Sequence, residues 1–598
     1  MNSRYRYAVA VTVVSLCCRL LDITRLRVDV MHLDDALKML GEFGWYQRVH
    51  LLLVCGFAIL CAWHGLNMVF LGAVPHFHCS LSDVNATWYG VNQSQLKDLL
   101  IPEGEGCKRY SVNSSLHRLT SVQWVNADVT NGTAAQEACP AGYVFSTDEY
   151  DSTITSEFKL VCTKKFLQSI SKCVFFAGRF LGAAVFGQLS DRFGRRPMFF
   201  VGVAMMMLTG GVAAAAPNVF VFLSMYLLQG AASTGAFVIS YILIMELVGP
   251  KYRVFAGFVI LIFCSLGYVS LAGIAYFIRN WRYLELAITA PSLLFLFYWW
   301  LLPESLRWLL SHDKTEEARR VLQTVARRNG KALPEDVVKS LQDDPNLKAT
   351  RTYTVLDCVR TRRMACLSLN VWFNWLVNSL VYYGLSLNTE NLAGSPYLNF
   401  CLVGAVEIPA YALCILIVNR VGRRKPLIVT MVVSGVASVV AGLIPTTSSN
   451  LKTLTVVFVM IAKFGISASY GTIYLASAEI FPTVVRNIGM GVSSMSARIG
   501  DILAPLILES TNIAPFLPMM LFGGLSMLGA ALAFLLPETS GRPLPQFLED
   551  VDYGNNCMAC CKSRTTSKGN DSLSIPRKEN ELGVFSICSL PEQDKTVV

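Results

Sequence analysis

Charged side chains lie inside several long apolar segments of this sequence, where a charge costs roughly 3 kcal/mol or more and is usually kept for a function. Glu407 is followed two residues later by Pro409, which disturbs a helix and frees a backbone carbonyl group. Arg498 and Asp501 are three residues apart, so they share one helix face. A guanidinium facing a membrane cavity can hold a carboxylate through two hydrogen bonds; the alternative is that this pair satisfies only itself. The other charged residues of these segments are Lys172, Arg179, Glu285 and Lys463.

Aromatic side chains gather in the apolar segment 364–387. Trp375 and Tyr382 are seven residues apart and therefore share a helix face. The face of an aromatic ring attracts a quaternary ammonium group by roughly 0.5–2 kcal/mol. A packing face or a belt at the membrane interface is the alternative. Together with Glu407 and Arg498, these rings would suit the two ends of a small zwitterion. The same segment also holds Trp372, Phe373 and Tyr383.

The elements that position these residues are helices, because the composition is that of a membrane protein. The chain has 598 residues, of which 53% are hydrophobic and only 15% charged, and its mean hydropathy is +0.46. Since a soluble domain has roughly 25% charged residues, this balance excludes a soluble globular protein and a mostly disordered one. We predict an all-α polytopic membrane protein. Twelve apolar runs are long enough to span a bilayer, at 49–73, 166–189, 198–217, 219–244, 254–278, 284–302, 364–387, 397–418, 427–445, 452–477, 488–509 and 515–536.

Arginine and lysine gather in two short connections, after the second and the eighth apolar runs. These residues are Arg192, Arg195, Arg196, Arg420, Arg423, Arg424 and Lys425. The positive-inside rule places both connections in the cytoplasm, and an even number of spans returns the chain to its starting side. The net charge of +10 then reflects topology rather than a nucleic-acid site. Both termini are predicted to be cytoplasmic.

Three motifs occur twice, in the same order. GQLSDRFGRR at 187–196 matches VNRVGRRKP at 418–426, MELVGPKYR at 245–253 matches AEIFPTVVR at 478–486, and LPES at 302–305 matches LPET at 536–539. Their offsets are 228, 233 and 234 residues. Two similar six-helix halves with a substrate site between them describe a secondary transporter. The predicted divisions are an N-terminal cytoplasmic segment 1–48, halves 49–302 and 364–536, a cytoplasmic linker 303–363 and a cytoplasmic tail 537–598.

The loop 75–165 differs in composition from the rest of the first half. It holds the cysteines Cys79, Cys107, Cys139 and Cys162, and glycosylation sequons at Asn85, Asn92, Asn113 and Asn131. An even number of cysteines together with sequons is typical of an oxidising, extracellular compartment, whereas free thiols and unused sequons are the alternative. We predict an extracellular glycosylated loop with two disulfides. Four cysteines allow three pairings, and the sequence leaves all three open.

The motifs GQLSDRFGRR, LPESLRWLL, VEIPAY and AEIFPTVVRN, with the four-cysteine loop, resemble solute carrier family 22. This is the organic cation, carnitine and organic anion transporter family of the major facilitator superfamily. The resemblance covers residues 31–545 and implies twelve transmembrane helices in two pseudo-symmetric halves. It also implies transport across the plasma membrane by alternating access. VEIPAY, after a first half that contains YFIRNWR, is more similar to the carnitine branch than to the simple cation branch.

The resemblance assigns substrate contacts to residues singled out above. Trp375 and Tyr382 match pocket positions of the family, and its cation transporters have an acid at the position of Glu407. Arg498, which lies beside Asp501, stands where simple cation transporters have Asp and where the carnitine and anion branches have Arg. The combination favours carnitine-like or betaine-like substrates over simple cations.

In this superfamily the DRFGRR loop latches against the other half and stabilises one access state. The residues concerned are Asp191, Arg192, Gly194, Arg195 and Arg196. Gly194 would permit a tight turn, and Asp191 can accept hydrogen bonds at a helix N-terminus. The alternative is that the charges only set the topology.

Further ion pairs are expected around the membrane boundary. Glu246 precedes Arg253 by seven residues, and Glu479 precedes Arg486 by seven, so each pair is expected at a cytoplasmic helix end, where it would break and reform as the halves rock. Arg179 and Glu285 depart from the family, which is usually apolar at both positions. They are expected to pair with each other or to lie near a membrane surface.

The sequence shows no catalytic constellation, so we predict a transporter and not an enzyme. It lacks a G-x-x-x-x-G-K-[ST] loop for ATP, and His64 has no second ligand at metal-binding spacing, so no cofactor and no metal site are expected. Sodium coupling stays open.

The predicted partners are a small organic cation or zwitterion and the lipid bilayer. An organic anion exchanger of the same family and a channel are the alternative functions, and a proton-coupled sugar symporter is disfavoured.

The polar tail 546–598 reads as disordered and contains two short features. Cys557, Cys560 and Cys561 supply too few ligands for zinc and favour palmitoylation beside Lys562 and Arg564. The end Lys595-Thr596-Val597-Val598 suits a PDZ-type scaffold domain, which would hold the terminal carboxylate and the apolar last side chain.

Overall fold

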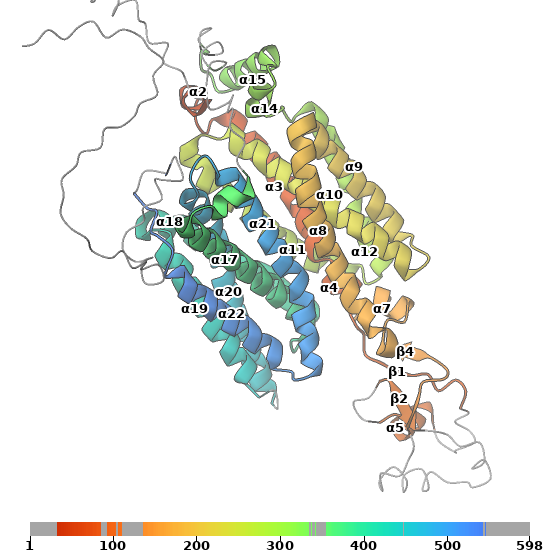
Figure 1. The fold of residues 1–598 in the computed structure, drawn as a ribbon. Helices are drawn as coiled ribbons and strands as arrows, with labels where there is room; N and C mark the ends of the chain where they lie inside the picture. The colour runs from red at the N-terminus through yellow and green to blue at the C-terminus, as the bar shows by residue number, and fades with distance from the viewer. Residues whose placement is uncertain are drawn as a thin grey trace, which may run out of the picture. The chain divides into compact units, whose positions relative to one another are not determined.

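The computed structural model describes residues 33–84, 92–102, 106–110, 136–333, 337, 341, 354–445, 448–541 and 545. Within this part of the chain, eleven helices are long and apolar enough to cross a membrane, and one further apolar helix is shorter. They form two groups that lie side by side (Figure 1). The architecture is that of the predicted two-half membrane protein.

The spanning elements follow the predicted apolar runs closely. The first half contains α3 (Trp45–Leu66) with α4 (Met68–Leu71), α8 (Lys165–Phe193), α9 (Arg195–Ala214), α10 (Val219–Leu247), α11 (Arg253–Phe277), and α12 (Trp281–Thr289) with α13 (Ser292–Leu296) and η5 (Phe297–Trp300). The second contains α17 (Arg362–Leu387), α18 (Pro396–Val421), α19 (Arg424–Leu443), α20 (Ser449–Ile480), α21 (Arg486–Leu508) and α22 (Leu517–Ala533).

Proline accounts for two differences from the predicted boundaries. The run 284–302 is not one helix, because Pro291 interrupts the hydrogen bonding between α12 and α13. The last helix starts at Leu517 with Pro518 in its first turn and has 17 residues, fewer than the predicted run 515–536.

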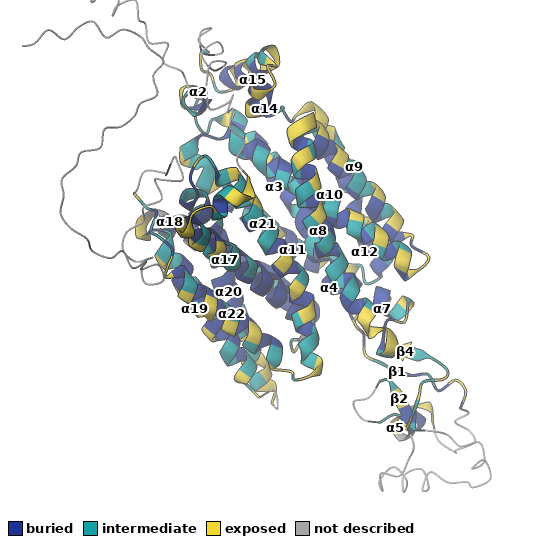
Figure 2. Cartoon of the chain, viewed as in Figure 1, coloured by how far each residue is buried: buried dark blue, intermediate teal, exposed yellow. Residues whose placement is uncertain are grey.

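Small residues bring helices of one half close together. Gly178 and Gly182 of α8 face the backbone of α10, where a Cβ added at Gly182 would lie 2.3 Å from the Ala231 carbonyl oxygen. Such spacing of small residues is how helices associate in membranes, where lipid is as apolar as leucine. The outer faces carry large exposed apolar side chains such as Leu208 and Leu443, and exposed positions line the outer sides of α9 and α19 (Figure 2).

Two glycines reverse the chain at equivalent places. Gly194 between α8 and α9 has φ +102°, and Gly422 between α18 and α19 has φ +99°. This backbone region strongly favours glycine, because a Cβ would clash with the neighbouring carbonyl. Both glycines belong to the first of the repeated motifs, so the structure gives that motif the same turn in both halves.

The described part of the large loop is a small disulfide-linked unit. β1 (Phe77–Cys79) pairs antiparallel with β4 (Tyr143–Phe145), and β2 (Lys108–Tyr110) with β3 (Gln136–Ala138), next to α5 (Gln93–Leu100) and α7 (Ile154–Glu157). The disulfides are Cys79–Cys139 and Cys107–Cys162, which selects one of the three pairings. The sequon at Asn92 is exposed. The predicted sequons at Asn85, Asn113 and Asn131 lie outside the described residues.

The loop strands lie at one end of the helices, which we call the loop end (Figure 1). The other end, which we call the linker end, carries α2 (Leu33–Met39), α14 (Leu306–Ser311) and α15 (Thr315–Arg328). The short helices η7 (Asn388–Asn391) and η8 (Glu509–Asn512) follow α17 and α21. The cysteines and the C-terminal motif predicted in the tail lie outside the described residues.

Candidate functional site

A cavity lies between the two halves, with an empty volume of about 710 Å³ that includes the space opening towards solvent. Four helices of each half contribute to its wall: α3, α8, α10 and α11 from the first, and α17, α18, α20 and α21 from the second. A position between pseudo-symmetric halves is where secondary transporters bind substrate. The polar and aromatic side chains of the wall are Phe175, Arg179, Ser233, Thr234, Phe237, Tyr268, Tyr382, Tyr383, Tyr411, Tyr470, Tyr474 and Arg498.

Tyrosine dominates the aromatic part of the wall. The ring of Tyr382 stacks on that of Tyr470, with 5.4 Å between centroids, and Tyr470 packs edge-on against Tyr474 at 5.5 Å. Trp375 lies behind this layer: its ring is 4.2 Å from Tyr474, and its indole N–H donates to Ser477 Oγ at 2.8 Å. Of the two aromatic residues predicted to contact substrate, the structure therefore places Tyr382 on the wall and Trp375 in support of it.

Two arginines of the wall share one carboxylate. Arg498 and Asp501 share a helix face, as their spacing of three residues predicted, and Arg498 donates to Asp501 Oδ2 at 2.8 Å. Arg179 Nη1 lies 3.8 Å from the same oxygen and donates to the Tyr383 hydroxyl at 2.7 Å. Ser379 also donates to Asp501. The two guanidinium groups exceed the one carboxylate by a single positive charge, so this side of the cavity attracts an anionic group.

The expected pairing of Arg179 with Glu285 is wrong. Arg179 reaches across to the second half and Asp501, whereas Glu285 lies on α12 and pairs at 3.8 Å with His64. The sequence did not predict that Arg179 lies on the cavity wall. An arginine in place of the apolar residue usual in the family does not indicate which way its side chain points. Its presence inside an apolar run was the available signal.

Glu407 has its own cation. Lys463 of α20 lies 2.8 Å from Glu407 Oε1, and Ser265 of α11 donates to Oε2 at 2.7 Å. The Lys463 ammonium also donates to Ser386 Oγ at 2.7 Å and sits 3.2 Å from the centroid of the Tyr382 ring. Neither Glu407 nor Lys463 lines the cavity. The predicted acid is thus present behind the wall, but its charge is already balanced.

Contacts between the halves close the cavity towards the loop end. Lys172 of α8 forms an ion pair with Glu390 of η7 at 2.8 Å. Ser169 donates to Glu509 of η8, and Tyr397 of α18 donates to the Glu149 carbonyl at 2.7 Å. These bonds join the two halves on one side of the cavity, so they must break for that side to open.

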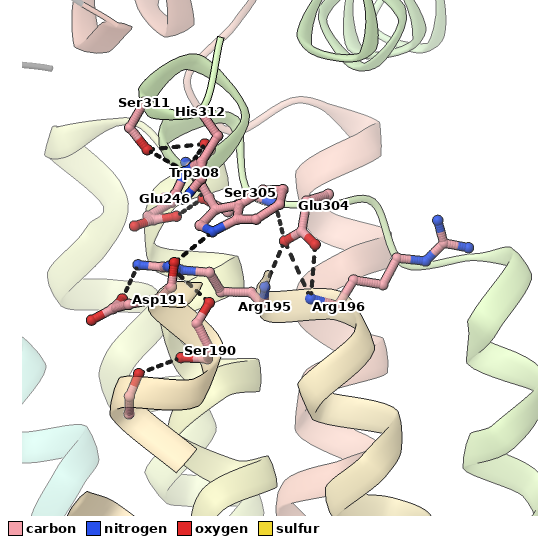
Figure 3. A network of polar contacts seen from close by, with 11 residues as sticks. Ser190, Asp191, Arg195, Arg196, Glu246, Glu304, Ser305, Trp308, Ser311 and His312 are labelled. Atoms are coloured by element: carbon pink, nitrogen blue, oxygen red, sulfur yellow. Dashed lines mark hydrogen bonds and ion pairs between the residues drawn. The ribbon is translucent and has the colours of Figure 1, made fainter. Parts of the chain in front are cut away.

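The predicted latch loop between α8 and α9 is capped by an acid at the start of the linker (Figure 3). Glu304 accepts hydrogen bonds from the backbone N–H groups of Arg195 (2.9 Å) and Arg196 (3.2 Å) at the start of α9. A carboxylate there satisfies free N–H groups and the positive end of the helix dipole. Arg195 pairs with Asp191 at 2.8 Å, and Arg192 is exposed.

The same loop is bonded to α14 and lies beside the end of α10. The indole of Trp308 donates to the Asp191 carbonyl at 2.8 Å, and the Ser305 hydroxyl donates to Glu246 (Figure 3). Among the described residues, the polar contacts of the loop therefore lie within the first half and the linker. The resemblance implied contact with the other half, which this conformation does not show.

The second half repeats this arrangement. Glu538 accepts hydrogen bonds from the backbone N–H groups of Arg423 (2.8 Å) and Arg424 (3.1 Å). These bonds hold the pKa of Glu538 below its usual value, although burial alone would raise it. Glu479 accepts from the Arg423 side chain at 2.9 Å and from Thr539. The repeated motifs are thus one structural unit in each half.

The ion pair of Glu246 with Arg253 that the seven-residue spacing predicted is not formed. Arg253 pairs with Asp34 of α2 at 2.6 Å, and Arg486 donates to the Phe481 carbonyl at 3.2 Å. The reason is that the helix ends at Leu247, between Glu246 and Arg253, so the arginine begins the next helix. The bond and charge of Arg253 hold the pKa of Asp34 below its usual value, against the effect of burial.

Comparison with known proteins agrees with this description. The family model of the sugar (and other) transporters matches residues 117–550. The Organic cation transporter protein of Drosophila melanogaster is 40% identical over 528 residues, which cover 87% of this chain and 94% of the relative. The Organic cation/carnitine transporter 2 of Homo sapiens is 34% identical over 527 residues, covering 87% and 93%. The Beta-alanine transporter of Drosophila melanogaster is 33% identical over 602 residues, covering 94% and 97%.

Among solved structures, the proton:xylose symporter XylE from E. coli has the same fold. Its TM-score is 0.55 at 17% identity, covering 83% of this chain and 98% of XylE. The fold, the matching family model and these relatives make the chain a transporter of the major facilitator superfamily, not an enzyme. The chain belongs to solute carrier family 22, because its organic cation and carnitine transporters match it over most of its length.

Proposed function

We propose that this chain carries small organic zwitterions, carnitine-like or betaine-like, across the plasma membrane by alternating access. The observation that carries the proposal is the pair of arginines, Arg179 and Arg498, that share the single carboxylate of Asp501 on a largely aromatic wall. A substrate carboxylate would supply the missing negative charge, and the tyrosine rings would bind the ammonium end.

The charge balance of the whole site supports a zwitterion over a simple cation. Glu407 and Lys463 cancel, which leaves one positive charge from the group formed by Arg179, Arg498 and Asp501. A simple cation would be repelled by this positive charge, and the wall offers it no unpaired acid to bind. The relatives named for carnitine and for beta-alanine fit this reading, since both compounds carry a carboxylate and an ammonium group.

An organic anion exchanger is the second candidate, because the same positive surplus would also hold an anion without an ammonium group. Uptake of a labelled panel in expressing cells separates the two: carnitine, beta-alanine, tetraethylammonium and p-aminohippurate, each with and without sodium. Saturable uptake of the zwitterions supports the proposal. Preference for p-aminohippurate would replace it with the exchanger, and preference for tetraethylammonium would contradict both. Flux that neither saturates nor shows counter-transport would indicate a channel.

In the proposed topology the disulfide-linked loop is extracellular and the linker end faces the cytoplasm. The contacts of Lys172, Ser169 and Tyr397 with the opposite half then close the outer side of the cavity. The capped turns at Gly194 and Gly422 would keep the cytoplasmic helix ends of each half rigid while the halves move relative to each other. Glycosidase treatment of the mature protein tests the orientation. A loop in the cytoplasm would carry no glycans, so the treatment would leave the gel mobility of the protein unchanged.

A further inference from the structure

A second polar centre lies inside the first half, away from the wall of the cavity. Glu285 of α12 is fully buried. It accepts hydrogen bonds from Gln229 Nε2 of α10 at 2.6 Å and from Asn67 Nδ2, between α3 and α4, at 2.8 Å. Among the described residues its ion-pair partner is His64 of α3, with 3.8 Å between Nδ1 and Oε1. The transport mechanism proposed above uses none of these groups.

Within the described part of the chain, the elements around Glu285 bring no permanent cation to it. α10 contributes the Tyr226 hydroxyl, which donates to Asn67 Oδ1 at 2.7 Å. α9 approaches through Gly210, and the four residues of α4 are all apolar. On α12 itself, Arg282 is bound to Glu157 at 2.5 Å. An ionised Glu285 beside a neutral imidazole therefore leaves a net negative charge buried, and one added proton removes it.

The hydrogen bonds already allow for that proton. Gln229 Nε2 lies 2.9 Å from His64 Nδ1 as well as 2.6 Å from Glu285, so its two N–H groups donate to both. Gln229 Oε1 has no hydrogen-bond partner in the described structure. When a proton arrives on His64 Nδ1 or on Glu285, rotation of this amide turns the free Oε1 into its acceptor.

We propose that Glu285 and His64 together bind one proton, and that this proton is a co-substrate of transport. The link to the transport cycle runs through Asn67, which joins α3 to α4 and donates to Glu285. One turn further, Phe70 of α4 packs against Phe400 of the second half, with 5.0 Å between ring centroids. A proton on Glu285 changes the acceptor that Asn67 meets and thereby the position of α4, so it shifts the balance between the open loop end and the closed one seen here.

The first test needs no substrate and therefore stands apart from the proposed substrate class. The full chain in lipid vesicles is titrated from about pH 5 to about pH 8.5, the range in which histidine changes charge, and its infrared spectrum is recorded. A protonated-carboxyl band that changes with pH and disappears in Glu285→Gln supports the proposal. Glu285→Asp keeps an acid at this position and should shift the band to another frequency. That shift assigns the band to residue 285 even if the Gln variant does not fold. If neither a protonated-carboxyl band nor an imidazolium band that depends on Glu285 changes with pH, the proposal is overturned.

The second test measures coupling. Wild-type uptake of beta-alanine or carnitine, whichever is transported, is expected to be several-fold faster at an external pH of about 5.5 than at about 8, and this ratio falls to about one in Glu285→Gln. Glu317→Gln on the exposed face of α15 is the matched control and keeps the wild-type ratio. A Glu285→Gln variant with the wild-type pH dependence overturns the proposal. If neither compound is transported, the zwitterion assignment fails while the infrared result still decides the proton site.

Discussion

Asp501 sets the charge balance of the cavity at the scale of single residues. It is fully buried and receives hydrogen bonds from Arg498 and Ser379, with Arg179 3.8 Å away. Because two guanidinium groups share it, neither is fully paired, and the Nε atom of Arg498 has no partner in the described structure. A substrate carboxylate that completes this pairing gains from donors already held in place.

Arg498→Ala is expected to reduce uptake of zwitterions about tenfold or more, while uptake of any transported simple cation changes far less. The physical reason is that the substrate carboxylate loses a charged donor in a site of low dielectric constant. Arg498→Lys keeps the charge but cannot form two parallel hydrogen bonds, so its uptake of zwitterions should lie between that of the wild type and that of Arg498→Ala. Initial rates for both substrate classes, corrected for surface expression, give the comparison. An equal loss for both would point to folding or gating.

Lys463→Met is expected to destabilise the protein by about 3–5 kcal/mol, because it leaves Glu407 buried without its cation. The pair is fully buried and its atoms are 2.8 Å apart. The double variant Glu407→Gln with Lys463→Met removes both charges and should recover most of the loss. Thermal unfolding of the purified variants in detergent measures this. A double variant as unstable as the single one would show that Lys463 acts through packing.

Sequence reasoning identified charged residues of the site but not all of their partners. Arg498 and Asp501 lie three residues apart on one helix, so their contact followed from helical spacing. Glu407 and Lys463 come from different helices of the second half, and no local pattern relates them. The same limit applies to Arg179, whose partners Tyr383 and Asp501 lie in the other half.

At the scale of elements, close helix packing rests on individual glycines. Gly182→Ala is expected to destabilise the first half by about 1–3 kcal/mol or more, because the new Cβ would lie 2.3 Å from the Ala231 carbonyl of α10. Gly187→Ala is the matched control on the same helix, since a Cβ there meets nothing within 4 Å. That control should be neutral or slightly stabilising, as alanine is the better helix former. Melting temperatures of the two variants decide, and equal effects would exclude the packing argument.

The helices themselves were predictable, because each apolar run is long and the lipid requires every backbone group to be bonded within the segment. Breaks inside runs were harder to predict. Pro291 divides the sixth run, and Asn67 interrupts the first between α3 and α4. The ion pair expected between Glu246 and Arg253 failed for the same reason, since a spacing of seven residues places two side chains on one face only while the helix continues.

At the scale of the whole molecule, the two halves are joined by contacts that must open and close. Lys172→Glu is expected to place two acids against each other with Glu390 and so to disfavour closure at the loop end. Its maximal uptake rate should fall several-fold. The charge swap, Lys172→Glu with Glu390→Lys, restores the pair and most of the rate. Maximal rates at saturating substrate test this, and failure of the swap to restore the rate would mean that the ion pair is not part of the gate.

The caps on the repeated turns bear on how such a chain can arise. Glu304 serves the start of α9 and Glu538 the start of α19, and each lies a few residues after the last helix of the half whose turn it caps. The distance between equivalent residues grows from 228 at the turns to 234 at these acids, so length has changed in the connections while the bonds have stayed the same. A half that completes its own helix ends does not depend on its neighbour to do so. Duplication of one ancestral half would therefore produce two units that are each already complete at this end, free to diverge in the residues that face the cavity.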